Sequence, residues 1–142
     1  MSTENNKAVA RRLVEEVING GNMALVNDLL APTYVEHAAP PGFPTDREGF
    51  KMFFTAFRAA FPDLHYHIAD EIAEGDKVVN RATAHGTMKG EFQGMPATGK
   101  TGTWTEMHVS RYEGGKIMEH WAVVDQMGML VSLGVMPPPG AK

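Results

Sequence analysis

The chain has 142 residues, 43% of them hydrophobic, which is enough for one domain with a buried core. Thirteen Lys and Arg against 17 Asp and Glu give a net charge of −4, which argues against a nucleic-acid-binding protein. The lack of Cys excludes disulfides, thiolate metal sites and a Cys nucleophile. Because the sequence shows neither a membrane-length apolar run nor a signal-peptide pattern, we expect a cytoplasmic protein that does not bind membranes.

The first half of the chain shows apolar residues at a helical period, broken by Gly and Pro. It therefore predicts helices separated by short connections. The expected elements are a helix over 8–18 ended by Asn19-Gly20-Gly21, a short helix over Met23–Leu30 capped by Asn22 and ending before Pro32, an extended piece over Tyr34–His37, and a Pro-rich loop over Ala38–Thr45.

Thr45-Asp46-Arg47-Glu48 has the pattern of a capping box, which predicts the start of a third helix that Pro62 ends. The phenylalanines of this helix fall on one stripe. Such a stripe is typical of a core-facing helix, and it can also form the apolar wall of a ligand pocket. The stripe consists of Phe50, Phe53, Phe54, Phe57 and Phe61.

From Leu64 the hydrophobic period changes to two, which predicts four long antiparallel strands. Strands this long favour a curved sheet, so we expect an α+β fold in which the N-terminal helices pack on a strongly curved sheet around an internal pocket. We assign residues 1–136 to one domain and 137–142 to a flexible tail. The predicted elements are strands over Leu64–Ala73, Lys77–Lys89, Lys100–Glu113 and Lys116–Val124, and a last helix over Gln126–Leu133 with Asp125 as its N-cap.

The strand hairpin over 100–124 carries the most informative pattern. Trp104, Glu106 and His108 alternate with other residues, so they share one face of a strand. A three-residue loop at Glu113-Gly114-Gly115 places His120 opposite His108, and Glu106 opposite Ala122. A two-residue loop would instead place the two histidines on opposite faces. We adopt the first register.

In that register Glu106, His108 and His120 form a group suited to proton transfer near neutral pH. The alternatives are a polar, exposed sheet face without chemistry, and a metal site with a His/His/Glu ligand set. From these residues alone, all three interpretations stay open.

Several other side chains are weaker candidates. His37 precedes a Pro-rich loop and could reach a pocket mouth, and Asp125 stands where a strand end meets a pocket rim. His65 and His67 share a strand face, which is most simply a surface position. Trp121 has the opposite parity to His120, so we expect it on the outer sheet face, where an exposed Trp indicates a dimer contact.

These residues, in this order, resemble the SnoaL-like polyketide cyclase (ester cyclase) family of the nuclear-transport-factor-2-like (NTF2-like) superfamily. The resemblance covers nearly the whole chain. It implies a cone-shaped α+β barrel with an apolar pocket, no cofactor, and dimers or tetramers formed through the outer face of the sheet. The matching segments are Asn19-Gly-Gly-Asn22, Arg47-Glu-Gly-Phe50, Ala60-Phe-Pro-Asp-Leu64, Glu74-Gly-Asp76, Gly86-Thr-Met-Lys-Gly-Glu-Phe-Gln-Gly-Met-Pro-Ala-Thr-Gly99, and Gly115-Lys-Ile-Met-Glu-His-Trp121 with Asp125 and Gly128.

The resemblance also implies a chemistry, the intramolecular aldol closure of a polyketide ester ring by an Asp acid/base with a nearby His. The family His falls on His108 and a neighbouring Gln position on Glu106. The family's catalytic Asp falls on Ala122, which cannot move a proton, and Asp125 matches a second acidic position. We hypothesise that Glu106 replaces the missing base, with Asp125 as the other candidate.

The sequence thus predicts an enzyme that performs acid/base chemistry of the enolate or aldol type on a hydrophobic, polyketide-like or cyclic carbonyl compound. The alternatives are a non-catalytic binder of a small hydrophobic ligand and a subunit that serves a partner through its sheet face. The predicted catalytic residues are His108, Glu106, His120 and Asp125, and the predicted substrate-binding residues are His37, Phe54, Phe57, Phe61, Trp104 and Ala122.

Overall fold

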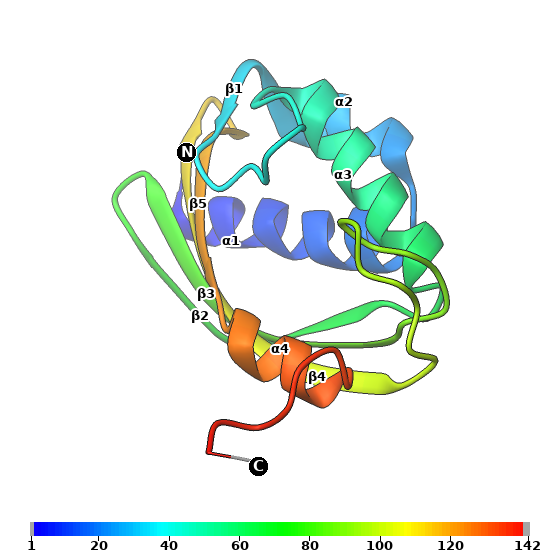
Figure 1. The fold of residues 1–142 in the computed structure, drawn as a ribbon. Coiled ribbons are helices and arrows are strands. Elements are labelled where there is room, and N and C mark those ends of the chain that lie inside the picture. The colour runs from blue at the N-terminus through cyan, green and yellow to red at the C-terminus, as the bar shows by residue number, and fades with distance from the viewer. Residues whose placement is uncertain (1, 141–142) are drawn as a thin grey trace.

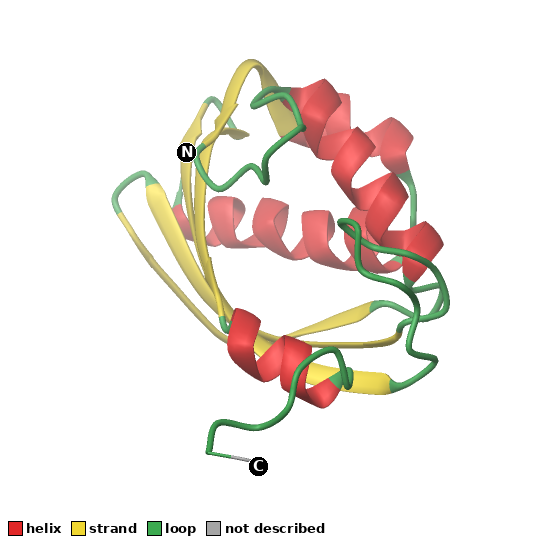
Figure 2. Cartoon of the chain, in the orientation of Figure 1, coloured by secondary structure: helices red, strands yellow, loops and turns green. Residues whose placement is uncertain are grey.

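The computed structural model describes residues 2–140, which form an α+β fold of helices packed on a five-stranded sheet (Figures 1 and 2). The helical elements are α1 (Thr3–Arg12), a π-helical continuation (Leu13–Asn19), a 3₁₀ turn (Met23–Leu25), α2 (Val26–Leu29), α3 (Arg47–Ala60) and α4 (Gln126–Ser132). The strands are β1 (Leu30–Glu36), β2 (His65–Glu74), β3 (Lys77–Thr87), β4 (Thr101–Glu113) and β5 (Lys116–Val124).

The sheet has the strand order β1-β5-β4-β3-β2. Strands β2 to β5 pair antiparallel, and β1 pairs parallel with β5. The sheet curls strongly, with α1 and α3 on its concave side (Figure 1), but its edges do not meet. The predicted α+β class with a curved, mainly antiparallel sheet is confirmed, and the barrel is open.

The N-terminal helix forms where the sequence predicts it. It begins earlier than its apolar stripe, because the side chain of Ser2 caps it by accepting a hydrogen bond from the Asn5 amide. It continues through the π-helical turn and ends before Gly21, whose φ of 75° favours glycine.

The second helix differs from the prediction. It is a 3₁₀ turn followed by the four-residue α2, and the side chain of Asn22 makes no capping hydrogen bond. The chain is already extended at Leu30, so Pro32 lies inside β1 rather than after a helix. Because β1 is an edge strand, a residue without a backbone N–H is tolerated there.

Helix α3 begins one residue later than the capping-box pattern predicts. The N-cap is Asp46, not Thr45, and its carboxylate accepts a hydrogen bond from the Gly49 amide at 2.9 Å. The phenylalanine stripe of α3 faces the concave side of the sheet. There Phe57 stacks on Phe92 from the loop after β3, with ring centroids 4.7 Å apart.

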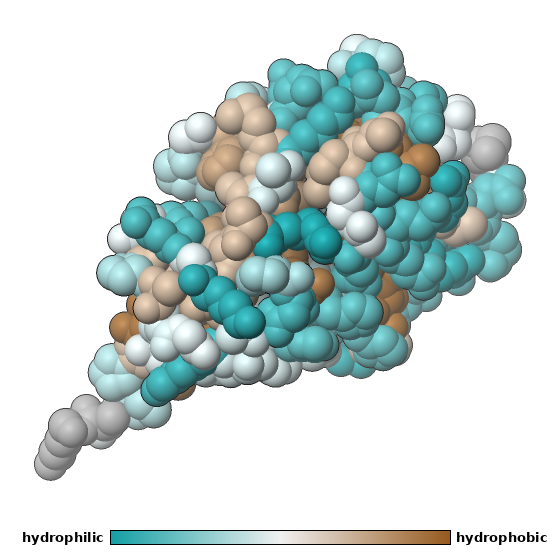
Figure 3. All heavy atoms as spheres, turned by 90° about the vertical axis from the view of Figure 1, so that its right-hand side faces the viewer, coloured by the Kyte–Doolittle hydropathy of each residue, from teal (hydrophilic) through white to brown (hydrophobic). Residues whose placement is uncertain are grey.

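The core lies between the curled sheet and the helices, and Phe61, Met88, Ile117 and Leu133 are among its fully buried side chains. The molecular face on the right of Figure 1 carries separate hydrophobic patches among hydrophilic residues (Figure 3). Among residues 2–140, none of the helices has the length and apolar character needed to span a membrane. Pro137 to Gly140 are exposed, and the last two residues of the predicted tail, 141–142, lie outside the described residues.

The register of the β4–β5 hairpin corrects the prediction. The loop has two residues, Gly114 and Gly115, with φ of 58° and 80°, so Glu113 pairs with Lys116. A β-bulge then follows, because Tyr112 pairs with Ile117 while Arg111 pairs with Glu119. The extra residue restores the parity that the shorter loop removes, so both histidines still point to the concave face.

The bulge also changes the predicted pairs. His108 lies opposite Ala122, and His120 lies opposite Ser110. Glu106 lies opposite Val124, so the predicted pairing of Glu106 with Ala122 is wrong.

Candidate active site

The concave side of the sheet contains a cavity of about 500 Å³. Phenylalanines of α3 and the Pro-rich loop after β1 form its apolar wall, while strands β1, β2, β4 and β5 contribute most of its polar groups. The residues that line it include Pro40, Pro41, Phe43, Phe50, Phe53, Phe54, Phe57, Phe92, Ala122, Val124 and Met129, with the polar Glu36, Tyr66, Gln93, Glu106, His108, His120 and Gln126. This volume lies within the range of small-molecule sites in proteins.

Four ionisable side chains form one hydrogen-bonded row on the cavity wall. The Oε1 of Glu106 lies 2.8 Å from Nε2 of His108, and Nδ1 of His108 lies 2.8 Å from Nε2 of His120. The Nδ1 of His120 lies 2.7 Å from Oε2 of Glu36. We call this row, Glu106–His108–His120–Glu36, the relay.

Glu106 is buried and Glu36 is partly buried, and both carboxylates accept further hydrogen bonds. The Oε2 of Glu106 accepts from the Tyr66 hydroxyl and from the Trp104 indole, each at 2.8 Å. The Oε1 of Glu36 accepts from the Tyr34 hydroxyl at 2.7 Å, and Oε2 accepts from the Ala38 amide. Each carboxylate is therefore held in one orientation by neutral donors.

These contacts keep both carboxyl groups ionised. Burial by itself would raise the pKa of Glu106, but the hydrogen bond and charge of His108, with the Trp104 and Tyr66 donors, outweigh it, and the pKa is lowered. The pKa of Glu36 is lowered in the same way, with burial opposed mainly by His120 and Tyr34. Burial raises the pKa of the Tyr66 and Tyr34 hydroxyls, so both remain neutral donors.

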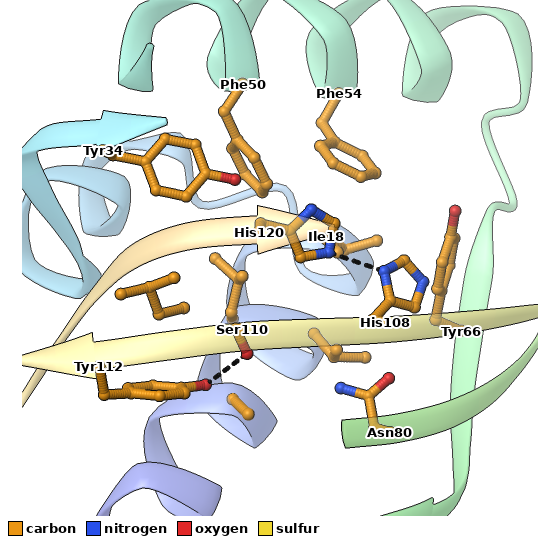
Figure 4. A pocket seen from close by; sticks show the side chains of 14 residues that line it. Ile18, Tyr34, Phe50, Phe54, Tyr66, Asn80, His108, Ser110, Tyr112 and His120 are labelled. Atoms are coloured by element: carbon orange, nitrogen blue, oxygen red, sulfur yellow. Dashed lines mark hydrogen bonds between the residues drawn. The ribbon is translucent and has the colours of Figure 1, made fainter. Parts of the chain in front are cut away.

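A second, smaller cavity of about 40 Å³ lies against the same imidazoles (Figure 4). Residues of α1, its π-helical continuation, β1, β3 and β4 line it, among them Ile18, Tyr34, Asn80, Ser110 and Tyr112. His108 and His120 line both cavities. Each of the two rings therefore borders open space on two sides.

The structure brings together most of the predicted site. Glu106, His108, His120, Phe54, Phe57 and Ala122 all line the larger cavity. Trp104 is buried behind it and contacts the site through Glu106, and Phe61 lies in the core, fully buried.

Two predicted residues lie elsewhere. His37 is exposed, contacts Glu119 at 3.0 Å and stacks on Trp121. Asp125 is exposed at the start of α4, where its carboxylate accepts a hydrogen bond from the Gly128 amide. The structure therefore does not bring either side chain to the relay. Among residues 2–140, no three or more His, Cys, Asp or Glu side chains are arranged to hold a metal ion.

Three site residues were missed in the sequence. Glu36 and Tyr34 share a face of β1, and Tyr66 lies between the two histidines of β2 and points to the opposite face from them. The alternation of Tyr34 and Glu36 within an extended piece was the available signal. Its meaning depends on the parallel pairing of β1 with β5, in which Glu36 lies beside His120.

Comparison with known proteins gives the following likenesses. The model of the family described as SnoaL-like polyketide cyclase matches residues 8–133. A search of curated proteins gave no match. IdmH from Streptomyces antibioticus, provisionally described as a polyketide cyclase, is 36% identical, with a TM-score of 0.80 and coverage of 91% of this chain and 98% of that one.

Two further solved structures are similar over nearly the full length. AclR from Streptomyces galilaeus, provisionally described as a hydroxylase, is 28% identical, with a TM-score of 0.82 and coverage of 96% of this chain and 100% of that one. TsrD from Streptomyces laurentii has a TM-score of 0.87 at 24% identity, with coverage of 96% of this chain and 99% of that one. At this identity the likeness supports the fold only. With the family model matched over residues 8–133, the chain belongs to the SnoaL-like polyketide cyclase family, within the NTF2-like superfamily.

Proposed function

We propose that this protein is an enzyme that performs acid/base chemistry of the enolate or aldol type on a hydrophobic, polyketide-like or cyclic carbonyl compound. The observation that carries the proposal is the relay on the wall of a cavity of about 500 Å³ lined by aromatic side chains. The phenylalanine wall would hold the carbon skeleton, and the imidazoles would move protons.

The contacts of Glu106 argue against the hypothesis that this side chain is the catalytic base. The Glu106 oxygens accept hydrogen bonds from Tyr66, Trp104 and His108, and the side chain does not face Ala122. We therefore assign Glu106 to positioning His108, and assign proton transfer to the imidazoles. Ring closure would proceed in three steps. An imidazole takes the α-proton, and the resulting enolate carbon forms a C–C bond with a second carbonyl carbon. The alkoxide formed there takes a proton from an imidazolium.

The test is turnover of an aromatic polyketide methyl ester, followed by mass-resolved chromatography and by deuterium uptake at the carbonyl α-carbon. We expect the wild type to exchange, and His120→Asn to lose about 10²–10⁴-fold in rate. His65→Asn, an exposed histidine on the outer sheet face, is the matched control and should keep the wild-type rate. Activity that appears only in Ala122→Asp would contradict the assignment to the histidines.

A second candidate function is non-catalytic binding of a small hydrophobic ligand. It is favoured by Ala122, which lies opposite His108 and which, by the resemblance described above, falls on the family's catalytic Asp. Binding of the ester without exchange, with an affinity unchanged in His120→Asn, would support this candidate over the enzyme.

A further inference from the structure

The four ring nitrogens of the relay each have one hydrogen-bond partner. The outer two face the carboxylates of Glu106 and Glu36. The inner two, Nδ1 of His108 and Nε2 of His120, face one another at 2.8 Å, the link drawn in Figure 4. A base needs a free lone pair, and an acid needs a proton that it can donate. The relay as it stands is therefore closed to a substrate, which must open one of its links.

The number of protons in the relay follows from these contacts. An ionised carboxylate accepts hydrogen bonds only, so the nitrogens facing Glu106 and Glu36 must both carry hydrogen. Two neutral rings would then turn two lone pairs toward each other across 2.8 Å, which is repulsive, and a proton on both inner nitrogens would place two hydrogens in that gap. One proton in the gap satisfies every group. The two rings then carry three protons, so together they form one imidazole and one imidazolium.

The surroundings agree with this count. The groups that face the rings from other elements are the carboxylate of Glu36 and hydroxyl of Tyr34 on β1, the hydroxyl of Tyr66 on β2, and the amide of Asn80 on β3. On β4 they are the carboxylate of Glu106 and the hydroxyl of Tyr112, a group whose pKa burial raises to about 12. The single imidazolium therefore lies between two negative charges, which stabilise it.

The central link differs from the two outer links, because it joins two imidazoles and involves no carboxylate. Opening it leaves one ring with a free lone pair and the other with a free N–H, side by side on the wall of the larger cavity. The cavity of about 40 Å³ on the other side gives the rings room to turn. A ligand that opens the link must offer a hydrogen-bond acceptor to one ring and an acidic hydrogen to the other.

We propose that Glu36 and Glu106 are paired positioning residues that hold one shared proton between His108 and His120, and that a β-dicarbonyl compound is the ligand that opens this link. The inference rests on the proposed acid/base function. A β-dicarbonyl compound carries a carbonyl oxygen next to an acidic C–H, and its enol carries a carbonyl oxygen next to an O–H. A simple carboxylate offers two acceptors and no hydrogen, so it leaves one ring without a partner.

The proton transfer is balanced in this arrangement. The α-C–H bond breaks, its proton forms an N–H bond on the neutral imidazole, and the electron pair becomes the C=C bond of the enol. The carbonyl oxygen takes the proton of the imidazolium. The rings therefore keep three protons throughout, and the relay closes again after release.

Glu36→Gln separates this reading from a structural role of Glu36. A glutamine amide can donate to Nδ1 of His120, which lets every nitrogen find a partner with two ring protons and no imidazolium. Glu119→Gln is the matched control, because Glu119 also contacts an imidazole but on the exposed side of the sheet.

The experiment counts nitrogen-bound ring protons of His108 and His120 by ¹⁵N-resolved NMR at neutral pH, on the wild type and both variants. We expect three in the wild type and in Glu119→Gln, and two in Glu36→Gln with the fold unchanged. Two or four ring protons in the wild type, or three in Glu36→Gln, would overturn the proposal.

The ligand is tested with benzoylacetone against butyrophenone, which has the same aryl ketone but lacks the second carbonyl. We expect benzoylacetone to bind at least about tenfold more tightly and to alter the ring-proton signals. Equal affinities would overturn the ligand assignment. Three ring protons and tight binding without catalysed deuterium exchange would contradict the proposed enzyme function but support the shared proton. Catalysed exchange in a protein with only two ring protons would support the enzyme function but contradict the shared proton.

Discussion

The imidazoles of His108 and His120 lie 2.8 Å apart although the two residues are not partners across the β4–β5 hairpin. The side chains reach each other diagonally, because the β-bulge opposite Arg111 and Tyr112 moves His120 next to Ser110. A diagonal arrangement leaves the position opposite His108 to Ala122, whose small side chain keeps the cavity open above the ring.

Glu106→Gln should change how stability depends on pH. The pKa of Glu106 is lower in the folded protein than its ordinary value of 4.5, so at acid pH the unfolded chain binds more protons. The stabilisation from this carboxylate is therefore present above about pH 4.5 and is lost as pH falls toward the folded-state pKa. We expect the stability difference between wild type and variant to shrink as pH is lowered, as measured by urea unfolding at several pH values.

The control for this measurement is Glu91→Gln, which changes an exposed carboxylate outside the relay. It should follow the wild-type profile. A Glu106→Gln difference that stays constant across the acid range would contradict the assignment of this carboxylate as an ionised anchor.

Asp125 offers a test between a helix cap and a catalytic acid. Its carboxylate accepts from the Gly128 amide, and Asn can make the same capping contact. Asp125→Asn should therefore keep both stability and deuterium exchange, while Asp125→Ala should lose about 0.5–2 kcal/mol of unfolding free energy. Thermal unfolding and the exchange assay check both variants. Loss of exchange in the stable Asp125→Asn variant would return Asp125 to the catalytic group.

Phe54 and Phe61 belong to the same predicted stripe but should respond differently to substitution. Phe61 is fully buried in the core, whereas Phe54 lines both cavities. We expect Phe61→Leu to cost about 1–3 kcal/mol in stability with little effect on ligand affinity. Phe54→Leu should cost less stability and weaken binding of benzoylacetone. Urea unfolding and calorimetric titration measure the two effects, and equal losses in both variants would contradict the division.

The homodimer expected from the sequence stays a prediction, and the outer sheet face gives its test. Met107 and Val123 pair there with exposed fractions of 44% and 74%, next to the pair of Val109 and Trp121. Burial of these side chains between two copies would stabilise a dimer. We expect light scattering at micromolar concentration to show a dimer that Val123→Lys weakens. Met52→Lys, on the exposed side of α3, is the matched control, and a monomeric wild type would contradict the prediction.

The sequence predicted most of the fold because its local patterns agree with the final packing. The alternation after Leu64 placed all four long strands, and the phenylalanine stripe placed α3 against the cavity. The helix caps were harder, since Thr45 and Asp46 are both good N-cap residues and the choice depends on the exact backbone turn.

The site was predicted in part and for a reason that was partly wrong. The shared face of Glu106, His108 and His120 is correct, but the predicted loop had three residues and the real hairpin combines a two-residue loop with a bulge. Both arrangements place the two histidines on the same face of the sheet, but they give each residue a different partner across the hairpin. Glu36 could not be placed, because its position depends on the pairing of β1 with β5 and not on any pattern within β1.

The parallel pairing of β1 with β5 has a consequence for how the protein folds. The contact between Glu36 and His120 spans 84 residues of chain, whereas His108 and His120 are separated by only 12. Closing the longer loop costs more conformational entropy, so the hairpin can assemble well before the edge strand docks. A partly folded chain would then hold its two imidazoles without the second carboxylate. Acid/base competence would thus arrive late in folding, when the N-terminal third of the chain takes its place at the sheet edge.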